Sequence, residues 1–395
     1  MSISLRFVIF FSTLTLVVVL GHIYLYRRLF RDTARHPAWR RTGVVLMALL
    51  ASTMIAARLL TRLLPSEASS AFEQLGWFWM GGATYLLLAV LSLGGVRTLT
   101  GWLERRRAAG AAPVSEERRE FLARATAGAA LVATGGVASY GVWRAYTPPV
   151  VNEVAVRLPG LPRALDGFTI VQLSDIHVGP LIQRRFMDAM VARTNALKGD
   201  LVCITGDLVD GSVEELGFAA SALSNLRSRH GTYFVTGNHE YYSGDEEWTE
   251  ALQRMGVTVL RNRHVSIGEP GASFDLVGVD DWAATRSGYP ASRGYDLAAA
   301  TAGRDVSRAA VLLAHQPAGW REQALKAGMG LQLSGHTHGG QFFPFNLVVS
   351  AIWEHPAGLY REGDSSLYVS RGTGFWGPPV RVAAPPEIVK ITLLA

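Results

Sequence analysis

The sequence has little cysteine: Cys203 is the only one among 395 residues. A single thiol excludes an intrachain disulfide framework, and it excludes a zinc module built on cysteine ligands. Charged residues are also scarce, at 18% of the chain, whereas 49% of the residues are hydrophobic. Such a composition is too apolar for a disordered chain and more apolar than that of a typical soluble protein. We therefore expect two or three folded domains, at least one of them in an apolar environment.

Acidic residues are few in the first 148 positions, which hold 17 Arg and only 7 Asp or Glu. Residues 149–395 hold 21 Lys or Arg against 25 acidic residues, so the net charge of +6 comes from the first part alone. Thr147-Pro148-Pro149 marks the change, and we predict a membrane domain over 1–148 and a second domain over 149–395. No nucleic-acid partner is expected, because the mildly acidic second domain lacks the basic face that phosphate-backbone binding needs.

Four apolar stretches fill the first part, at residues 5–25, 43–64, 77–96 and 121–143. A helix of roughly 20 apolar residues spans the hydrocarbon core of a bilayer, so about four transmembrane helices are predicted. The fourth stretch is rich in Ala and Gly, and its alternative is a buried or interfacial helix.

Arginines set the predicted orientation of the four helices. They gather at 26–42 and 97–120, whereas residues 65–76 hold no basic residue. The two Arg-rich loops are therefore predicted to be cytoplasmic, which places residue 145 onward outside the cytoplasm. Arg118-Arg119-Glu120-Phe121-Leu122 also resembles a twin-arginine export signal, here inside the chain.

The second part alternates short β-branched runs with helical patterns. The runs Phe168–Leu173, Leu201–Thr205 and Thr232–Val235 are separated by helical patterns at about Ile182–Ala196 and Val213–Arg227. This order predicts an α/β sheet. Five later runs with fewer helices between them predict a second, mixed sheet: Phe274–Val279, Ala309–Leu313, Gly330–Leu333, Leu367–Val369 and Ile388–Leu394. We expect one domain with two packed mixed β-sheets flanked by helices.

Polar residues follow five of these runs directly. They are Asp175, His177, Asp207, Asn238, His239, His315, His336 and His338. Sites in α/β proteins lie just beyond the carboxyl ends of strands. Each residue alone has a structural explanation, such as a turn or, for Asp207, a helix cap. Eight metal-ligating or acid–base residues at five strand ends together indicate a functional site.

The ordered motifs are D-x-H at 175–177, G-D-x-x-D at 206–210, G-N-H-E at 237–240, His315 and G-H-x-H at 335–338. This set resembles the calcineurin-like metallophosphoesterase superfamily over residues 165–340. The residues at 237–244 and 334–341, together with the Pro-rich C-terminal segment at 377–388, are similar to those of a bacterial membrane-anchored branch of this superfamily. Many members have a single N-terminal segment or export signal, so four predicted spans depart from the pattern.

The resemblance implies two divalent metal ions, with Mn, Fe or Zn suited to Asp, Asn and neutral His ligands. Two ions about 3.5–4 Å apart neutralise the phosphate and activate water as hydroxide. One set of ligands is Asp175, His177, Asp207 and His338, and the other is Asp207, Asn238, His315 and His336, with Asp207 bridging. His239 is implied to be the catalytic histidine that is not a ligand. Asp210 is implied to orient a ligand histidine.

Several further residues have two readings each. Tyr241 either lines the pocket or packs in the core, and Arg371 and Arg381 are candidates to contact a substrate phosphate. The aromatic residues between Phe342 and Trp376 form either an apolar rim facing a lipid or ordinary core. Cys203 is expected to pack within a buried strand.

The resemblance therefore predicts a dinuclear-metal phosphoesterase in a bacterial inner membrane, with its catalytic domain on the extracytoplasmic side. Its expected partners are the lipid bilayer and a phosphorylated small-molecule or lipid substrate, first among them a lipid-linked envelope substrate. An alternative substrate is a UDP-linked acylated sugar of the lipid A type, and a phosphoprotein ranks third. The alternative class is a non-catalytic metal-binding membrane scaffold.

Overall fold

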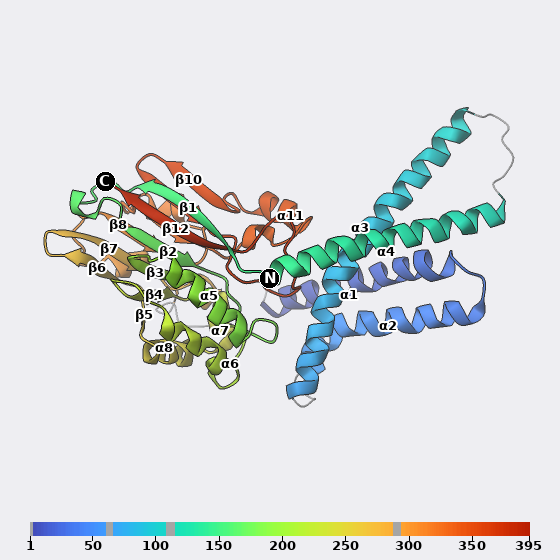
Figure 1. The fold of residues 1–395 in the computed structure, drawn as a ribbon, viewed down its shortest axis with the longest axis horizontal. Helices are drawn as coiled ribbons and strands as arrows, with labels where there is room; N and C mark the ends of the chain where they lie inside the picture. The colour runs from blue at the N-terminus through green and yellow to red at the C-terminus, as the bar shows by residue number, and fades with distance from the viewer. Residues whose placement is uncertain (1–2, 61–65, 108–114, 287–293) are drawn as a thin grey trace. The chain divides into compact units, whose positions relative to one another are not determined.

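The computed structural model describes residues 3–60, 66–107, 115–286 and 294–395 (Figure 1). The chain folds into two compact units. One unit comprises Met1–Gly141 with Gly377–Pro379, and the other comprises Val142–Trp376 with Val380–Ala395.

The N-terminal unit is helical. Its helices are α1 (Ile3–Tyr26), α2 (Pro37–Leu60), α3 (Ser66–Arg107) and α4 (Glu116–Tyr146). They pack through a small apolar core that includes Leu25, Met47, Leu86 and Ala130. Among the described residues, three segments are long and apolar enough to cross a membrane: Phe11–Arg31, Ser70–Glu104 and Glu116–Tyr146. The predicted multi-pass helical region is thus confirmed as a set of apolar helices of membrane-spanning length.

Two details differ from the expected loops and spans. The stretch 43–64 falls on α2, but its end at 61–64 lies outside the described residues, so a fourth span stays a prediction. Residues 66–76 of the expected loop and the Arg-rich residues 97–107 are helical parts of α3, which is 42 residues long. This segment contains no Pro, and Arg and Glu are good helix formers, so the helix continues past the apolar stretch.

In the second unit, the described residues form two six-stranded sheets. The first has the order β1 (Val150–Arg157), β12 (Glu387–Leu394), β2 (Thr169–Leu173), β3 (Leu201–Thr205), β4 (Thr232–Val235) and β5 (Val257–Val259). The second has the order β10 (Gly358–Glu362), β11 (Ser365–Val369), β9 (Leu331–Ser334), β8 (Ala310–Leu313), β7 (Ala272–Gly278) and β6 (Arg263–Glu269). Each sheet is mixed around four parallel strands, β2 to β5 in the first and β11, β9, β8 and β7 in the second.

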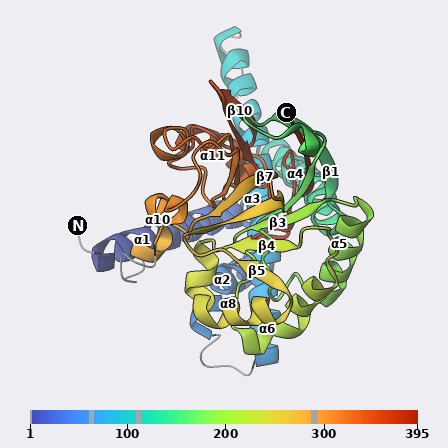
Figure 2. The same ribbon diagram turned by 90° about the vertical axis from the view of Figure 1, so that its left-hand side faces the viewer.

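The helices of this unit are α5 (Arg184–Ala196), α6 (Val213–Ala220), α7 (Asn238–Ser243), α8 (Asp245–Arg254), α9 (Ala283–Arg286), α10 (Leu297–Thr301) and α11 (Phe345–Ile352). The helix expected at Val213–Arg227 ends earlier, at Ala220, and a 3-10 turn over Ser221–Asn225 follows it. Figure 2 shows α5, α6 and α8 along the outside of the first sheet.

Three apolar layers hold the unit together. Val171 and Ile204 pack outward against Met190 of α5 and Trp248 of α8. A second layer fills the space between the sheets, and Cys203 lies there, fully buried, as expected. A third layer covers the outer face of the second sheet with residues of α10 and of the segment around Trp320. The predicted fold class, two packed mixed sheets flanked by helices, is therefore confirmed. The assignment of Ile388–Leu394 to the second sheet is wrong, because this strand is β12 and pairs with β1 and β2 in the first sheet.

Candidate functional site

The predicted site residues lie where the carboxyl ends of both sheets meet. Strands β2, β3 and β4 of one sheet end at Leu173, Thr205 and Val235, directly before the D-x-H, G-D-x-x-D and G-N-H-E motifs. Strands β8 and β9 of the other sheet end before His315 and the G-H-x-H motif. Hydrogen bonds join the two edges, since His315 Nδ1 lies 2.8 Å from the Thr205 carbonyl oxygen and Gln172 donates to Ser334 O over 2.9 Å.

The backbone at this edge is unusual. Five predicted ligands have positive φ angles: Asp175 at 51°, His177 at 56°, Asp207 at 50°, His336 at 73° and His338 at 51°. Residues other than Gly seldom adopt this left-handed conformation, and such residues cluster at functional sites. Tertiary packing therefore holds these five side chains in place against their local backbone preference.

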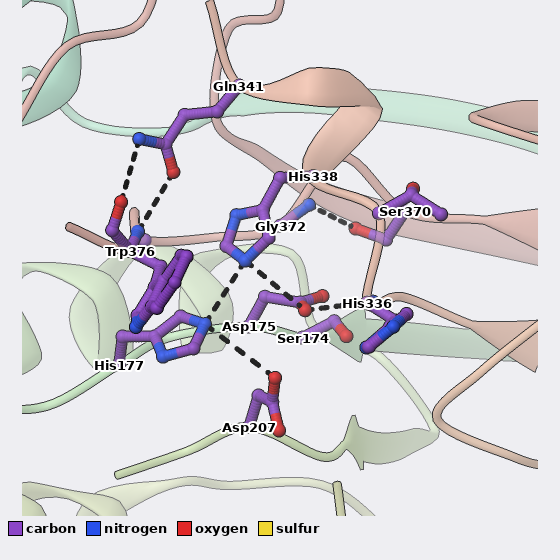
Figure 3. Close-up of polar contacts among 12 residues, drawn as sticks. Ser174, Asp175, His177, Asp207, His336, His338, Gln341, Ser370, Gly372 and Trp376 are labelled. Atoms are coloured by element: carbon purple, nitrogen blue, oxygen red, sulfur yellow. Dashed lines mark hydrogen bonds and ion pairs between the residues drawn. The ribbon is translucent and has the colours of Figure 1, made fainter. Parts of the chain in front are cut away.

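One cluster brings together Asp175, His177 and His338 (Figure 3). The Nε2 atoms of the two histidines lie 3.1 Å apart, and His338 Nε2 is 3.5 Å from Asp175 Oδ1. Ligand atoms 2.0–2.2 Å from one ion are about 3.0–3.5 Å from each other, so these separations suit a shared divalent ion. Asp207 Oδ2 lies 3.8 Å from His177 Nε2, on the side toward the second cluster.

The second cluster consists of Asp207, His315 and His336. His315 Nε2 lies 3.1 Å from Asp207 Oδ2 and 3.2 Å from His336 Nδ1. Because a carbonyl oxygen only accepts, the contact with Thr205 places a proton on His315 Nδ1 and, in a neutral ring, leaves Nε2 free to bind a cation. Burial lowers the pKa of His336 to about 3, so this ring is neutral at pH 7.

Two buried oxygens provide a separate test of fit to a metal. Asp175 Oδ2 and Asn238 Oδ1 are buried and have no hydrogen-bond partner among the residues that the structure describes. Buried polar atoms are nearly always satisfied, so such orphans call for a further partner such as an ion. Both atoms belong to predicted ligands of different ions, and both are hard oxygen donors of the kind that divalent cations bind. The residues present therefore fit a metal centre.

His239 and Asp210 lie beside the two clusters. Asp210 Oδ1 is 2.6 Å from His239 Nδ1 and 3.0 Å from His177 Nδ1, so one carboxylate oxygen contacts both rings. Burial alone would lower the pKa of His239, but the charges of Asp207 and Asp210 outweigh it and raise the pKa to about 9. His239 thus carries a proton at neutral pH, and its Nε2 lies 3.9 Å from Asp207 Oδ2.

Glu240 is a residue of the site to which the sequence reasoning gave no role. Its buried carboxylate accepts hydrogen bonds from the backbone N–H groups of Asp207, Leu208 and Gly237, over 3.0, 2.8 and 2.6 Å. Glu240 therefore fixes the loop that carries Asp207 to the start of α7. The available signal was its place in G-N-H-E, where a Glu three residues after a helix cap can reach back to the cap.

A short segment, Thr373–Trp376, links the site to the end of α4 within the same unit. The N–H groups of Thr373 and Gly374 donate to the carbonyl oxygens of Ser174 and Asp175, over 2.7 and 3.1 Å. The ring of Phe375 packs on Tyr146, the last residue of α4, with centroids 5.2 Å apart. The ring of Trp376 packs edge-on with His239 at 5.6 Å.

The three predicted substrate-binding residues have different surroundings. Tyr241 is buried, and its hydroxyl lies 3.2 Å from Thr236 Oγ1, which favours the packing interpretation. Arg371 is half-buried and pairs with Glu387 over 3.0 Å.

Arg381 is fully buried, and its guanidinium donates to the carbonyl oxygens of Arg371, His338 and Gly374. Its Nη2 also lies 3.2 Å from His338 Nδ1. With no exposed surface, Arg381 does not fit the predicted contact with a substrate phosphate. Its hydrogen bonds instead hold the loop that carries the candidate ligand His338.

Comparison with known proteins agrees with this geometry. A family model described as calcineurin-like phosphoesterase matches residues 168–340. A "Transmembrane protein with metallophosphoesterase domain" from Danio rerio is 34% identical over 403 residues, covering 98% of this chain and 89% of that protein. Its counterpart of the same name from Bos taurus is 35% identical, covering 96% and 87%. An uncharacterized metallophosphoesterase from Helicobacter pylori is 39% identical over 255 residues, covering 64% and 66%.

The similarity to the two vertebrate proteins extends through the helical N-terminal half, so this half is shared with relatives outside bacteria. The metal-fitting clusters, the matched family model and these relatives together lead to one conclusion. The chain belongs to the calcineurin-like metallophosphoesterase family and is a metal-dependent phosphoesterase that carries apolar helices of membrane-spanning length.

Proposed function

We propose that the chain is a dinuclear-metal hydrolase of phosphate esters, phosphodiesters or pyrophosphates. The observation that carries this proposal is the pair of orphan oxygens, Asp175 Oδ2 and Asn238 Oδ1, in the two halves of one buried ligand cluster. Asp175, His177 and His338 would hold one ion, Asn238, His315 and His336 the other, and Asp207 would bridge. Mn, Fe and Zn match this donor set.

Bound divalent ions supply charge neutralisation and an acidified water. The residues of the chain supply orientation and a proton. Thr205 O fixes the ring of His315, and Asp210 fixes the rings of His177 and His239. His239, protonated at neutral pH, donates a proton to the leaving oxygen as the P–O bond breaks.

We propose an amphiphilic, lipid-linked substrate at a cell membrane, in bacteria the inner membrane. Support comes from the contact between Phe375 and Tyr146, because it ties the end of an apolar helix to the segment that also contacts Asp175 and His239. A substrate whose phosphate lies at the bilayer surface would reach such a site without leaving the membrane. The arginines gathered at 26–42 and 97–120 favour a cytoplasmic location for these segments, which supports an extracytoplasmic catalytic domain.

Turnover of bis(p-nitrophenyl) phosphate by the full-length protein with added Mn tests the activity. Asp207→Asn should abolish turnover and bound metal together, whereas His239→Ala should reduce turnover about 100-fold or more and leave bound metal unchanged. Asp188→Asn, a change at an exposed carboxylate of α5, is the matched control and should be neutral. Activity that is indifferent to metal and to both substitutions would refute the proposal.

A reporter fused after Ala395 tests the side of the membrane. An enzyme that is active only outside the cytoplasm, such as alkaline phosphatase, should be active in this fusion. A cytoplasmic result would overturn the proposed orientation and would favour a UDP-linked acylated sugar as substrate.

A further inference from the structure

Helix α11 is an apolar helix that the described part of the chain does not bury. Its sequence, Phe345-Asn346-Leu347-Val348-Val349-Ser350-Ala351-Ile352, holds no charged residue and no buried one. Ile352 is 73% exposed, and Leu347 is 59% exposed. A helix of eight residues is not stable in water by itself, and most helices owe their stability to burial of an apolar face. We call the exposed apolar side chains of α11 and of the residues just before it the α11 face: Phe343, Phe345, Leu347, Val348 and Ile352.

Both ends of α11 are attached to the loop that carries the last two candidate ligands. At its C-terminal end, the ring of Trp353 packs edge-on against His336, with centroids 5.2 Å apart. At its N-terminal end, a Cβ atom on Gly340 would overlap Cα of Asn346, so the two backbones are in close contact. The α11 face is therefore held at a fixed position beside the metal cluster, although no side chain of the helix is buried.

A chain of contacts within the same unit connects this loop to the end of α4. The side chain of Gln341 donates to Trp376 O and accepts from Trp376 N, each over 2.9 Å. Trp376 follows Phe375, which packs on Tyr146. Trp143 and Tyr146, in the last turn of α4, are exposed aromatic residues of the kind that lie at a membrane–water interface.

Charge also favours a lipid environment for the α11 face. No Asp, Glu, Lys or Arg occurs from Gly339 to Trp353, in a catalytic unit whose other exposed segments carry charges freely. An apolar helix that lies in the interfacial layer buries its side chains among lipid acyl chains.

We propose that the α11 face inserts into the surface layer of the bilayer in which the N-terminal helices lie. The insertion places the metal cluster at the membrane surface, with α11 as its apolar edge. This inference is separate from the proposed hydrolysis, because insertion does not require turnover.

The test uses the full-length chain in nanodiscs, in a Cys203→Ala background, with an environment-sensitive fluorophore on Leu347→Cys. Lipids brominated on their acyl chains quench a fluorophore that contacts them. The matched control carries the fluorophore on Val306→Cys, which is 85% exposed and lies after α10. We expect at least a twofold loss of fluorescence at position 347 and no significant loss at position 306.

Equal quenching at the two positions would overturn the proposal. A change in the fluorescence at position 347 that appears only when each disc holds two chains would also overturn the proposal, since a second copy of the chain would then cover the α11 face. In a second set of variants the fluorophore is moved to Ile352→Cys, so that the result does not depend on a label at position 347. The pair Leu347→Glu and Val348→Glu should abolish quenching there, whereas Val306→Glu should preserve it; quenching that survives the first pair would contradict insertion.

Discussion

Asp210 accepts a hydrogen bond from Nδ1 of His239 over 2.6 Å, and the same oxygen lies 3.0 Å from Nδ1 of His177. One carboxylate thus orients the proposed proton donor and a proposed metal ligand together. Burial alone would raise the pKa of Asp210, but the charge of His177 and the hydrogen bonds from both rings outweigh it and lower that pKa. Asp210 therefore remains ionised across the working pH range.

The variant Asp210→Asn keeps the shape of this contact and removes its charge. We expect kcat/KM to fall 10- to 100-fold, as is typical when the partner of a metal-ligating histidine is lost. The raised pKa of His239 keeps its proton in place up to about pH 9, so activity that needs this proton declines as the pH rises through that value. Without the negative charge, the decline should begin at lower pH. A pH profile of kcat/KM from 6 to 10 measures the shift, and an unchanged alkaline limb would contradict the role of Asp210.

Glu240 should make the stability of the metal-depleted protein depend on pH. Burial and the charge of Asp207 raise the pKa of Glu240 from 4.5 to about 7. A raised folded-state pKa means that the protonated form is favoured on folding. Its contribution to the free energy of unfolding is therefore complete below pH 4.5 and is lost as the pH rises through 7, by about 3 kcal/mol at most. Glu240→Gln cannot ionise, so denaturant unfolding between pH 5 and 8 should show a flatter profile.

The exposed pair of Glu250 with Arg254 provides the control for this measurement. Glu250→Gln should leave the pH profile of the free energy of unfolding as it is in the unmodified protein. A Glu240→Gln profile as steep as that of Glu250→Gln would show that another group carries the pH dependence.

Gly237 leaves room for the carboxylate of Asp207. A Cβ atom at this position would overlap Oδ1 of Asp207 and lie 2.9 Å from its Cγ. The φ angle of Gly237 is −101°, which alanine adopts readily, and the three atoms nearest to the added Cβ, including the backbone N at 2.5 Å, all belong to Asp207. Gly237→Ala should lower kcat about 100-fold, the effect expected of a displacement of about 1 Å in a catalytic group. Gly217→Ala on α6, where the nearest atom would be 3.6 Å away, should leave kcat unchanged.

Cys203 should report unfolding of the catalytic unit. It is fully buried between the sheets, and burial raises the pKa of its thiol. A buried neutral thiol does not react with disulfide reagents. We expect no labelling by an aromatic disulfide reagent at pH 7.5 in the folded protein, and one thiol per chain after denaturation. Val306→Cys, at an exposed position, should add one fast-reacting thiol; fast labelling of the unmodified folded protein would disprove burial.

The strands next to the site could be predicted from sequence because local and tertiary preferences agree there. Leu201–Thr205 and Thr232–Val235 consist mainly of apolar, aromatic and β-branched residues, and the structure has strands with the same bounds. Strand β1, Val150–Arg157, was not predicted, because it interleaves Asn and Glu with valines and pairs with a strand more than 230 residues away. Helix α11 was not predicted either, since its eight mostly apolar residues do not indicate by themselves what environment would stabilise a helix.

The members of the candidate site could be predicted because their motifs are local in sequence. The burial of each side chain and the direction in which it points depend on distant parts of the chain and could not be predicted. Nothing in the residues around Arg381 indicates that the carbonyl oxygens of His338, Arg371 and Gly374 enclose its guanidinium. The role of Glu240 depends likewise on backbone N–H groups of another loop, at Asp207 and Leu208. Such roles follow from tertiary packing, which spacing along the chain does not encode.

The strand order β1-β12-β2 has a consequence for biosynthesis. Strand β12 lies between the first two strands of the catalytic unit and pairs with both, in parallel with β1 and antiparallel to β2. Until residues 387–394 have left the ribosome, β1 and β2 have no common neighbour, and the sheet that carries Asp175 cannot close. The apolar helices therefore leave the ribosome before the sheet of the hydrolase can close, and an exported catalytic unit would cross the membrane as an unfolded chain unless a translocase accepted it after synthesis.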